Sequence, residues 1–352
     1  MNIISRLFIF ITALCLVACG KKELPIYEEQ GYVFGTLVEV SVYGEDEGKA
    51  KKAVASVMRE FQRLHDLLHA WKPSELSDLN AAFAAGESRK VTPEVAAMLK
   101  DAAQLSAQSD GLFNPSIGGL IKLWGFHADE FKAVLPDEKQ VAKLVAAKPQ
   151  MSDLDFSPAR DGKGELVASR NKSVFLDLGG YAKGVALDRA SELLGQQGIH
   201  NALINIGGNV LAMGQHGDRA WRIGVQHPRK PGPIATMDLH DGEAIGTSGD
   251  YQRFFEVGGK RYCHLIDPRS GQPAQGVQAV TILTHGLHAG TLSDGPSKPL
   301  FIGGKAGWRE AARKMNLTEA LLIDSDGVVH LTAAMQKRLK FTDQATIRKI
   351  EP

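Results

Sequence analysis

The chain has 352 residues, of which 43% are hydrophobic and 23% are charged. This balance excludes an intrinsically disordered chain, in which charged residues would outweigh apolar ones. Its 41 basic and 40 acidic side chains leave a formal net charge of +1, so the composition gives no indication of nucleic-acid binding. The length suits one large domain or two.

The first 19 residues are typical of a bacterial lipoprotein signal. Arg6 supplies a positive charge, residues 7–17 are apolar, and LVAC at residues 16–19 matches the cleavage site. We expect residues 1–18 to be removed, Cys19 to carry the lipid, and residues 19–30 to form a tether in the bacterial cell envelope, facing the periplasm. An uncleaved anchor is less favoured, because the apolar run is too short to span a bilayer. The folded domain is predicted to cover residues 31–352.

The cysteines agree with this interpretation. Cys15 lies in the signal and Cys19 is the predicted lipid acceptor, which leaves Cys263 in the folded body. No disulfide can form within that body. We interpret Cys263 as a buried small hydrophobic residue rather than a nucleophile.

The N-terminal part of the domain contains a strand and two helices. Alternating apolar and polar side chains indicate a half-buried strand over residues 32–43. Apolar residues at helical spacing predict a helix over residues 49–69, followed by a polar turn at residues 69–80. A second helix begins after Thr92, since Pro93 is favoured in a first turn, and it stops before an Asp-Gly pair.

Less regular segments follow. Residues 111–126 mix glycine, asparagine and proline with large apolar side chains, and we interpret them as a loop that packs on the core. A short helix is predicted over residues 137–147. Residues 149–165 are expected to form a polar connection on the surface.

Residues 173–190, with the sequence SVFLDLGGYAKGVALDRA, form the central motif. An apolar run at residues 174–176 predicts a strand, and Gly179 and Gly180 predict a tight turn before a helix. Unpaired N–H groups at the helix start, together with Lys183, favour an anion. The alternative is an ordinary structural turn. The glycine spacing matches neither the Walker motif nor the dinucleotide fingerprint.

The C-terminal part is rich in short strands. A hairpin is predicted within residues 244–273, with Gly258 and Gly259 at its turn. The remaining elements are strands at residues 202–206, 221–226, 277–283, 320–323 and 328–331, and a helix at residues 306–315.

Five polar residues lie at strand ends or in turns, where ligand contacts are common: Asp177, Lys183, His264, Asp267 and Asp294. Each alone also has a structural explanation, since aspartate is a common turn former. Taken together and in order, these residues and the motifs around them resemble the ApbE family of bacterial flavin transferases. The resemblance covers nearly the whole mature chain and rests on KPSELSDLN, GLFNPSIGGLIKLWGF, DLGGYAKGVALD, INIGGNV, TSGDYQRFF and HLIDPRSGQP.

The resemblance implies an enzyme that binds FAD with Mg²⁺ and transfers the FMN half to a threonine or serine hydroxyl of an acceptor protein, releasing AMP. The expected acceptors are subunits of membrane redox complexes. The expected fold is an α+β domain with mixed and antiparallel sheets and packed helices, whose two intimately packed halves hold FAD in the cleft between them.

The resemblance also assigns roles to residues. His264 would be the catalytic base, and Asp294 would act in catalysis and bind the metal. The other metal ligands would be the backbone carbonyl of Gly180 or Ala182 and the side chain of Ser297. The residues implied to contact FAD are Phe34, Trp71, Leu112, Phe113, Asn114, Asp177, Lys183 and Ile266.

The chain departs from the family at one position. After the aspartate of its second metal-binding stretch the family typically has threonine four residues later, at a helix start, whereas this chain has SDGPSKPLF with Lys298 there. A protonated lysine has no lone pair for a metal, and Pro296 and Pro299 argue against a regular helix start. Three hypotheses follow. Ser297 supplies the oxygen while Lys298 points away, which we favour; Lys298 acts on the pyrophosphate and partly replaces the metal; or metal binding and turnover are weakened.

Two other functions compete with flavin transfer. A metal-dependent FAD pyrophosphatase would use water in place of the acceptor hydroxyl and yield FMN and AMP. A flavin-binding lipoprotein without catalysis is the other alternative, and Lys298 is the sequence argument for it.

Overall fold

The computed structural model of the chain describes residues 24–128 and 130–351. The predicted signal peptide and Cys19 lie outside these residues. In the described part of the chain, no helix is both long enough and apolar enough to span a membrane.

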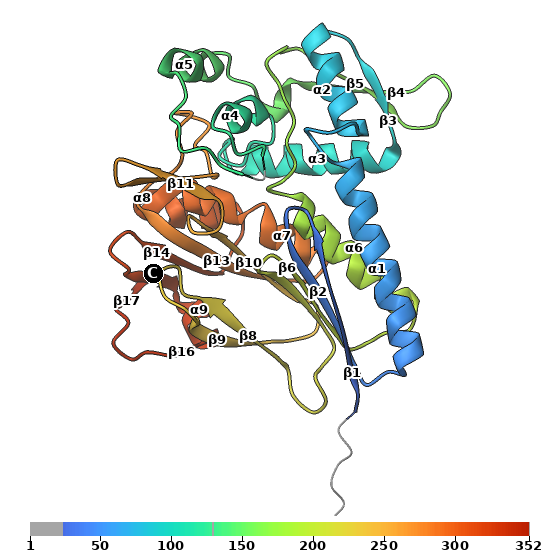
Figure 1. The fold of residues 1–352 in the computed structure, drawn as a ribbon, viewed down its shortest axis with the longest axis vertical. Helices are drawn as coiled ribbons and strands as arrows, with labels where there is room; N and C mark the ends of the chain where they lie inside the picture. Colours follow the sequence, from blue (N-terminus) through green and yellow to red (C-terminus); the bar gives the residue numbers. More distant parts are fainter. Residues whose placement is uncertain (1–23, 129, 352) are drawn as a thin grey trace, which may run out of the picture.

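A nine-stranded sheet forms one half of the molecule (Figure 1). Its neighbouring strands are antiparallel, except that the last two are parallel. In order across the sheet, the strands are β1 (Ile26–Val33), β2 (Thr36–Tyr43), β6 (Ala202–Ile206), β7 (Asn209–Met213), β10 (Glu243–Gly249), β13 (Val277–His285), β14 (Glu319–Asp324), β15 (Val329–Thr332) and β17 (Arg348–Glu351).

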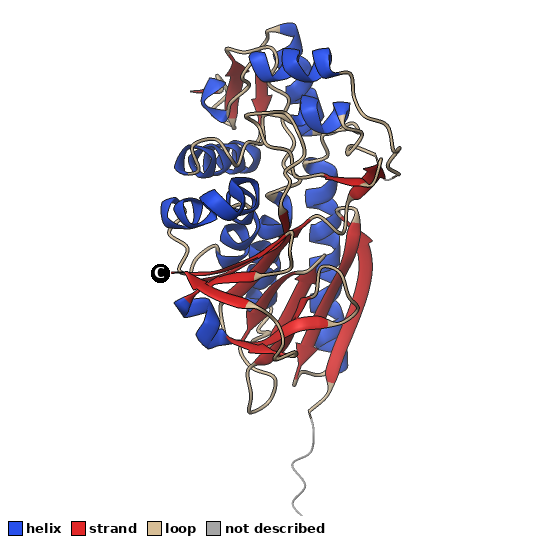
Figure 2. Cartoon of the chain, turned by 90° about the vertical axis from the view of Figure 1, so that its left-hand side faces the viewer, coloured by secondary structure: helices blue, strands red, loops and turns tan. Residues whose placement is uncertain are grey.

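Both faces of this sheet are covered. One face carries the helices α1 (Glu47–Leu67), α6 (Ala182–Gln196), α7 (Ala289–Asp294) and α8 (Ser297–Lys314). Figure 2 shows helices packed along one side of the sheet. Against the other face pack β8 (Trp221–Gln226), β9 (Pro233–Leu239), β16 (Leu339–Phe341) and α9 (Ala333–Arg338). Side chains alternate across a strand, so Leu322 of β14 packs with Trp308 of α8 while Leu321 packs with Met237 of β9.

The other half contains most of the remaining helices and a small sheet. Its helices are α2 (Glu75–Ala85), α3 (Pro93–Gln108), α4 (Gly118–Leu123), α5 (Glu138–Ala146) and the short 3₁₀ turn η1 (Met151–Asp153). The small sheet has the order β3 (Arg89–Val91), β5 (Glu165–Ser169), β4 (Leu154–Pro158). The hairpin β11 (Phe254–Val257) and β12 (Lys260–Cys263) packs against α4 and α5. The α+β class with mixed and antiparallel sheets is therefore confirmed.

The predicted tether and first strand need correction. Residues 26–30 belong to β1, and the single strand predicted over residues 32–43 is the hairpin β1–β2. Its two turn residues, Phe34 and Gly35, have φ of 56° and 69°, as a two-residue hairpin requires. The segment IYEEQ at the start of β1 has few apolar residues. Because β1 is an edge strand and is largely exposed, hydrophobic alternation does not predict it.

Three connections contain more regular structure than predicted. The turn at residues 69–80 includes the start of α2, where Ser74 and Ser77 form a reciprocal capping box. The packed loop at residues 111–126 contains α4, and the surface connection at residues 149–165 contains β4. The start of α2 is hard to recognise in the sequence because Ser77 takes the third helical position, where a capping box usually has Glu or Gln.

The central motif is partly as predicted. Helix α6 is confirmed, but residues 174–176 are extended without forming a strand, and Phe175 makes one isolated bridge to Ile117. The expected absence of a helix start after Asp294 is wrong, because α8 begins at Ser297. Pro299 is the third residue of that helix, where the N–H has no intrahelical acceptor in any case.

Candidate active site

A cleft of about 580 Å³ lies between the two halves. The large sheet contributes the β1–β2 turn and the end of β10, and the other half contributes Trp71 and the loop before α4. The glycine-rich turn at residues 177–183 lies between them. This volume falls in the range of about 300–1,000 Å³ that is typical of small-molecule sites.

The cleft brings together the residues implied to contact FAD. All eight line it, as do Gly180, Ala182 and the predicted base His264. Asp294 and Ser297 lie behind the lining residues, each about 1% exposed. FAD contact itself stays a prediction for every one of these residues.

Aromatic rings form apolar walls of the cleft. The ring of Trp71 stacks on Phe175 with a centroid distance of 4.8 Å and an interplanar angle of 14°. Phe34 packs edge-on against His65 at 5.7 Å, and its left-handed backbone, which is rare outside glycine, turns a large ring to the site. Such walls suit flat heteroaromatic rings.

The loop before α4 is held in place by Asn114. Its side-chain amide donates to the Pro149 carbonyl at 2.9 Å, and its side-chain oxygen accepts from the Ser116 N–H at 3.0 Å. The same loop accepts a 2.8 Å hydrogen bond from the N–H of Asp177 at the Pro115 carbonyl. Asn114 therefore shapes the cleft wall through the hydrogen bonds of its side chain to backbone groups.

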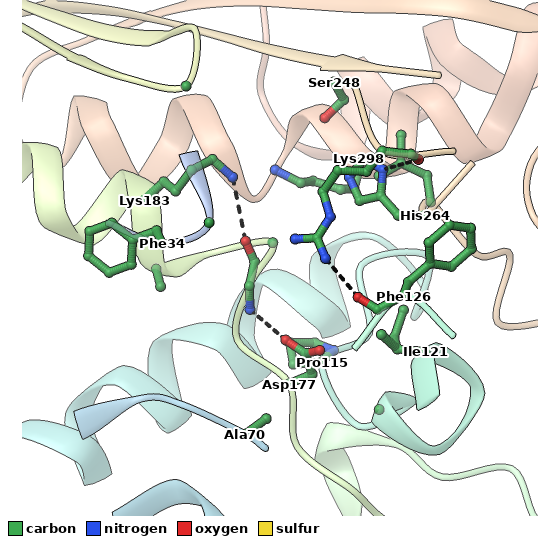
Figure 3. Close-up of a pocket in the computed structure, with 18 of the residues that line it drawn as sticks. Phe34, Ala70, Pro115, Ile121, Phe126, Asp177, Lys183, Ser248, His264 and Lys298 are labelled. Carbon is green, nitrogen blue, oxygen red and sulfur yellow. Dashed lines mark hydrogen bonds between the residues drawn. The ribbon is translucent and has the colours of Figure 1, made fainter. Parts of the chain in front are cut away.

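Asp177 and Lys183 lie on the glycine-rich turn (Figure 3). The Asp177 carboxylate accepts from the Gly179 N–H at 2.8 Å, and burial raises its pKa. The Lys183 ammonium donates to the Gly179 carbonyl at 3.5 Å. The turn thus holds the carboxyl group of Asp177 and the amino group of Lys183 at the cleft surface.

His264 is a neutral imidazole on the cleft wall. Burial, together with the positive charges of Arg253 and Lys183, lowers its pKa to about 3. Its Nδ1 lies 3.3 Å from the Arg253 carbonyl, and since a carbonyl only accepts, Nδ1 carries the proton. Nε2 is therefore the acceptor and can take a proton.

Sequence reasoning missed Arg253, which also lines the cleft. Its guanidinium donates to the Phe126 carbonyl at 2.7 Å and lies over the Phe131 ring at 5.4 Å. The available signal was its place in TSGDYQRFF, a polar turn between two strands. Cys263 is buried, and burial raises its thiol pKa to about 12, which confirms that it is not a ready nucleophile.

Asp294 is positioned by the contact between α6 and α7. A Cβ at Gly184 would lie 2.5 Å from the Gly290 carbonyl oxygen, so the two helices approach backbone to backbone. This contact lets the Gly184 N–H donate to the Asp294 carboxylate at 3.1 Å. Burial acts to raise the pKa of Asp294, but Lys183 and Lys298 outweigh it and lower that pKa, so the carboxylate is ionised.

Lys298 does not point away from the site, as we had expected. Its ammonium donates to the Asp294 carboxylate and, at 2.7 Å, to the Asp294 carbonyl. The Ser297 hydroxyl donates to the same carbonyl at 2.7 Å and lies 2.7 Å from the Ser248 hydroxyl. The part of the favoured hypothesis in which Lys298 points away is therefore wrong, whereas the role of Ser297 as a metal ligand stays a prediction.

Comparison with known proteins identifies the family. A model described as the ApbE family matches residues 34–322. The chain belongs to the ApbE family. It is 42% identical over 316 residues to an FAD:protein FMN transferase of Rhodobacter capsulatus, covering 90% of this chain and 59% of that protein. It is 30% identical over 361 residues to an FAD:protein FMN transferase of Treponema pallidum, covering 96% of each.

A solved ApbE structure has the same fold. The crystal structure of the ApbE protein from Thermotoga maritima superposes with a TM-score of 0.79 at 28% identity, covering 89% of this chain and 99% of that one. The ApbE fold therefore extends over the cleft and both halves that form it.

The expected magnesium site of an ApbE protein does not fit these residues as they are arranged. Both carboxylate oxygens of Asp294 already accept hydrogen bonds, from Lys298 and from the Gly184 N–H. The Ser297 hydroxyl donates its proton to the Asp294 carbonyl, which by itself leaves its oxygen lone pairs available. Mg²⁺ requires near-octahedral oxygen ligands, and an ammonium beside Asp294 opposes a second cation there.

Proposed function

We propose that this ApbE chain is an FAD:protein FMN transferase that places FMN on a threonine or serine hydroxyl of an acceptor protein and releases AMP. The names of its relatives support this activity. The observation that carries the proposal is the meeting, in one cleft, of aromatic walls, the cations Lys183, Arg253 and Lys298, and the imidazole of His264.

The proposed step is a displacement at phosphorus. The acceptor hydroxyl oxygen forms a bond to the phosphorus of the FMN half, and the bond from that phosphorus to the bridging oxygen breaks. The bridging oxygen leaves as part of AMP, and the hydroxyl proton passes to Nε2 of His264. Cations beside the pyrophosphate stabilise the charge that develops on the leaving phosphate.

Bound FAD would make His264 a better base. The cations that lower its pKa in the free cleft are the ones that would face the pyrophosphate. Two negative charges there would offset them and move the pKa upward. A base is most effective when its pKa is near the working pH, so substrate binding would activate His264.

We further propose that Cys19 carries a lipid anchor that holds the enzyme at the periplasmic side of the cell envelope, where membrane redox subunits would be its acceptors. The signal pattern of residues 1–19 supports this placement. Mg²⁺ remains a prediction from the family resemblance, and the Lys298 ammonium beside Asp294 argues against a metal at that carboxylate.

The test uses the full chain purified in detergent, FAD, and envelope proteins from cells that lack the chain. We expect covalently flavin-fluorescent bands on a denaturing gel, and mass spectrometry should place FMN on a threonine or serine. His264→Gln should bind FAD but form no adduct. Release of free FMN and AMP without adducts would instead indicate hydrolysis, and intact FAD would indicate binding without catalysis.

A further inference from the structure

Lys298 occupies a place that disfavours a positive charge. It is the second residue of α8, where the helix dipole is positive. Its side chain is only 12% exposed, so the ammonium is largely removed from water. An unpaired ammonium in such a place would be strongly destabilising, so the charge needs partners.

The Asp294 carboxylate is the partner of the Lys298 ammonium, and Lys183 shares it. The Lys298 ammonium donates to Oδ1 of Asp294, and the Lys183 ammonium lies 3.6 Å from the same oxygen. Lys183 comes from α6 and Lys298 from α8, so the chain brings two cations from distant segments to one carboxylate. One negative charge cannot neutralise both.

The excess positive charge faces the cleft. Among the described residues that line it, the lysines and arginines are Lys183, Arg253 and Lys298, and Asp177 is the one carboxylic acid. Figure 3 shows the side chains of Lys183 and Lys298 extending toward the middle of the cleft. A group with two negative charges, such as a diphosphate diester, would complete this arrangement.

We propose that Lys298 is a built-in cation of the cleft, which takes the place beside Asp294 that a divalent metal would need and which, with Lys183, neutralises the pyrophosphate of FAD. Asp294 is then a positioning residue for Lys298. This inference rests on the proposed function for the identity of the anion, whereas the exclusion of a metal from Asp294 rests on the contacts alone.

The first experiment tests metal exclusion without FAD. Calorimetric titration with Mn²⁺ alone should give no saturable binding to the full chain. Lys298→Thr removes the ammonium and leaves a hydroxyl beside Asp294, so this variant should gain a site, and adding Asp294→Asn should abolish it. Saturable Mn²⁺ binding to the unsubstituted chain that Asp294→Asn removes would overturn the inference.

The second experiment measures FAD affinity by quenching of flavin fluorescence, in EDTA and in Mg²⁺. The unsubstituted chain should bind FAD equally well in both. Lys298→Met should weaken binding by roughly tenfold or more, the equivalent of one charge-assisted hydrogen bond, and Lys298→Arg should retain most of the affinity. Lys305→Met removes an exposed lysine from the same helix and should leave the affinity unchanged.

The outcomes separate this inference from the proposed function. Loss of FAD affinity in EDTA, or wild-type affinity in a folded Lys298→Met protein, would overturn the role of Lys298 while leaving flavin transfer intact. Absence of FAD binding under both conditions would overturn the proposed function and the assigned anion together. The Mn²⁺ titration would still decide whether Lys298 keeps a metal from Asp294.

Discussion

The carboxylate of Asp188 on α6 caps the first turn of α7 at Thr291. It accepts hydrogen bonds from the Thr291 N–H at 2.8 Å and the Thr291 hydroxyl at 2.6 Å, and from the Gly290 N–H at 2.8 Å. Helix α7 ends at Asp294. The central motif therefore positions the buried carboxylate of Asp294 through Asp188 as well as through Gly184.

Replacing Asp188 with alanine should destabilise the fold and the site together. The loss of a cap and of buried hydrogen bonds should lower the free energy of unfolding by about 1–3 kcal/mol, and flavin transfer should fall because Asp294 moves. Chemical denaturation would measure the free energy of unfolding. An activity assay at a temperature where the variant is still folded would measure the loss of flavin transfer. Glu192→Ala on the same helix removes an exposed partner of Arg189 and should change neither. Equal stability of the two variants would contradict the capping role.

Gly184→Ala should be harmful for a steric reason. The new methyl group would lie 2.5 Å from the Gly290 carbonyl oxygen and 2.9 Å from Cβ of Asp294. We expect a loss of about 1–3 kcal/mol in the free energy of unfolding. Gly195→Ala on the same helix is the matched control, since no atom lies within 4 Å of its added carbon, and it should be neutral or stabilising by up to about 1 kcal/mol. A tolerated Gly184→Ala would show that α6 and α7 are not closely fixed.

Trp71→Ala should weaken FAD binding. The variant removes a ring that stacks on Phe175 and lines the cleft. Loss of one aromatic contact with a bound ring should reduce affinity by roughly tenfold, measured by flavin fluorescence. Trp71→Phe should keep most of the affinity, and unchanged binding by the alanine variant would place the rings of FAD elsewhere.

The stability of the free enzyme should depend on His264 at acidic pH. Its pKa is about 3 in the folded chain against an ordinary 6.5, so between these values the unfolded chain binds a proton that the folded chain does not. The stabilisation is present above pH 6.5 and is lost as the pH falls through this window. Urea unfolding at several pH values should therefore show a steeper loss for the unsubstituted chain than for His264→Gln. Parallel profiles would mean that His264 titrates normally in the folded state.

The sequence predicted those elements whose ends are determined by neighbouring residues in the chain. Helix α3 was predictable because Thr92 caps it and Pro93 begins it, and the Thr92 hydroxyl does accept from the Val95 N–H. Strand β1 was not predictable from alternation, because its partner β2 and its edge position determine it. The start of α8 was misjudged because a proline rule for helix interiors does not apply to the third residue of a helix.

The residues of the site were easier to predict than their contacts. The cleft gathers the predicted set because the family motifs mark its lining. The direction of Lys298 depends on where α7 ends, and that position is fixed by Asp188, which is more than a hundred residues away in the sequence. Arg253 was missed for a similar reason, since its guanidinium reaches the site through a contact with the Phe126 carbonyl.

The most direct test of the account compares AMP release with covalent FMN. The full chain, FAD and an acceptor identified from the fluorescent bands are incubated together, and AMP and FMN-modified acceptor are quantified over time. Flavin transfer predicts that the two products appear in equal amounts and that AMP release stops when the acceptor is omitted. AMP release that continues without acceptor, accompanied by free FMN, would contradict the transferase assignment.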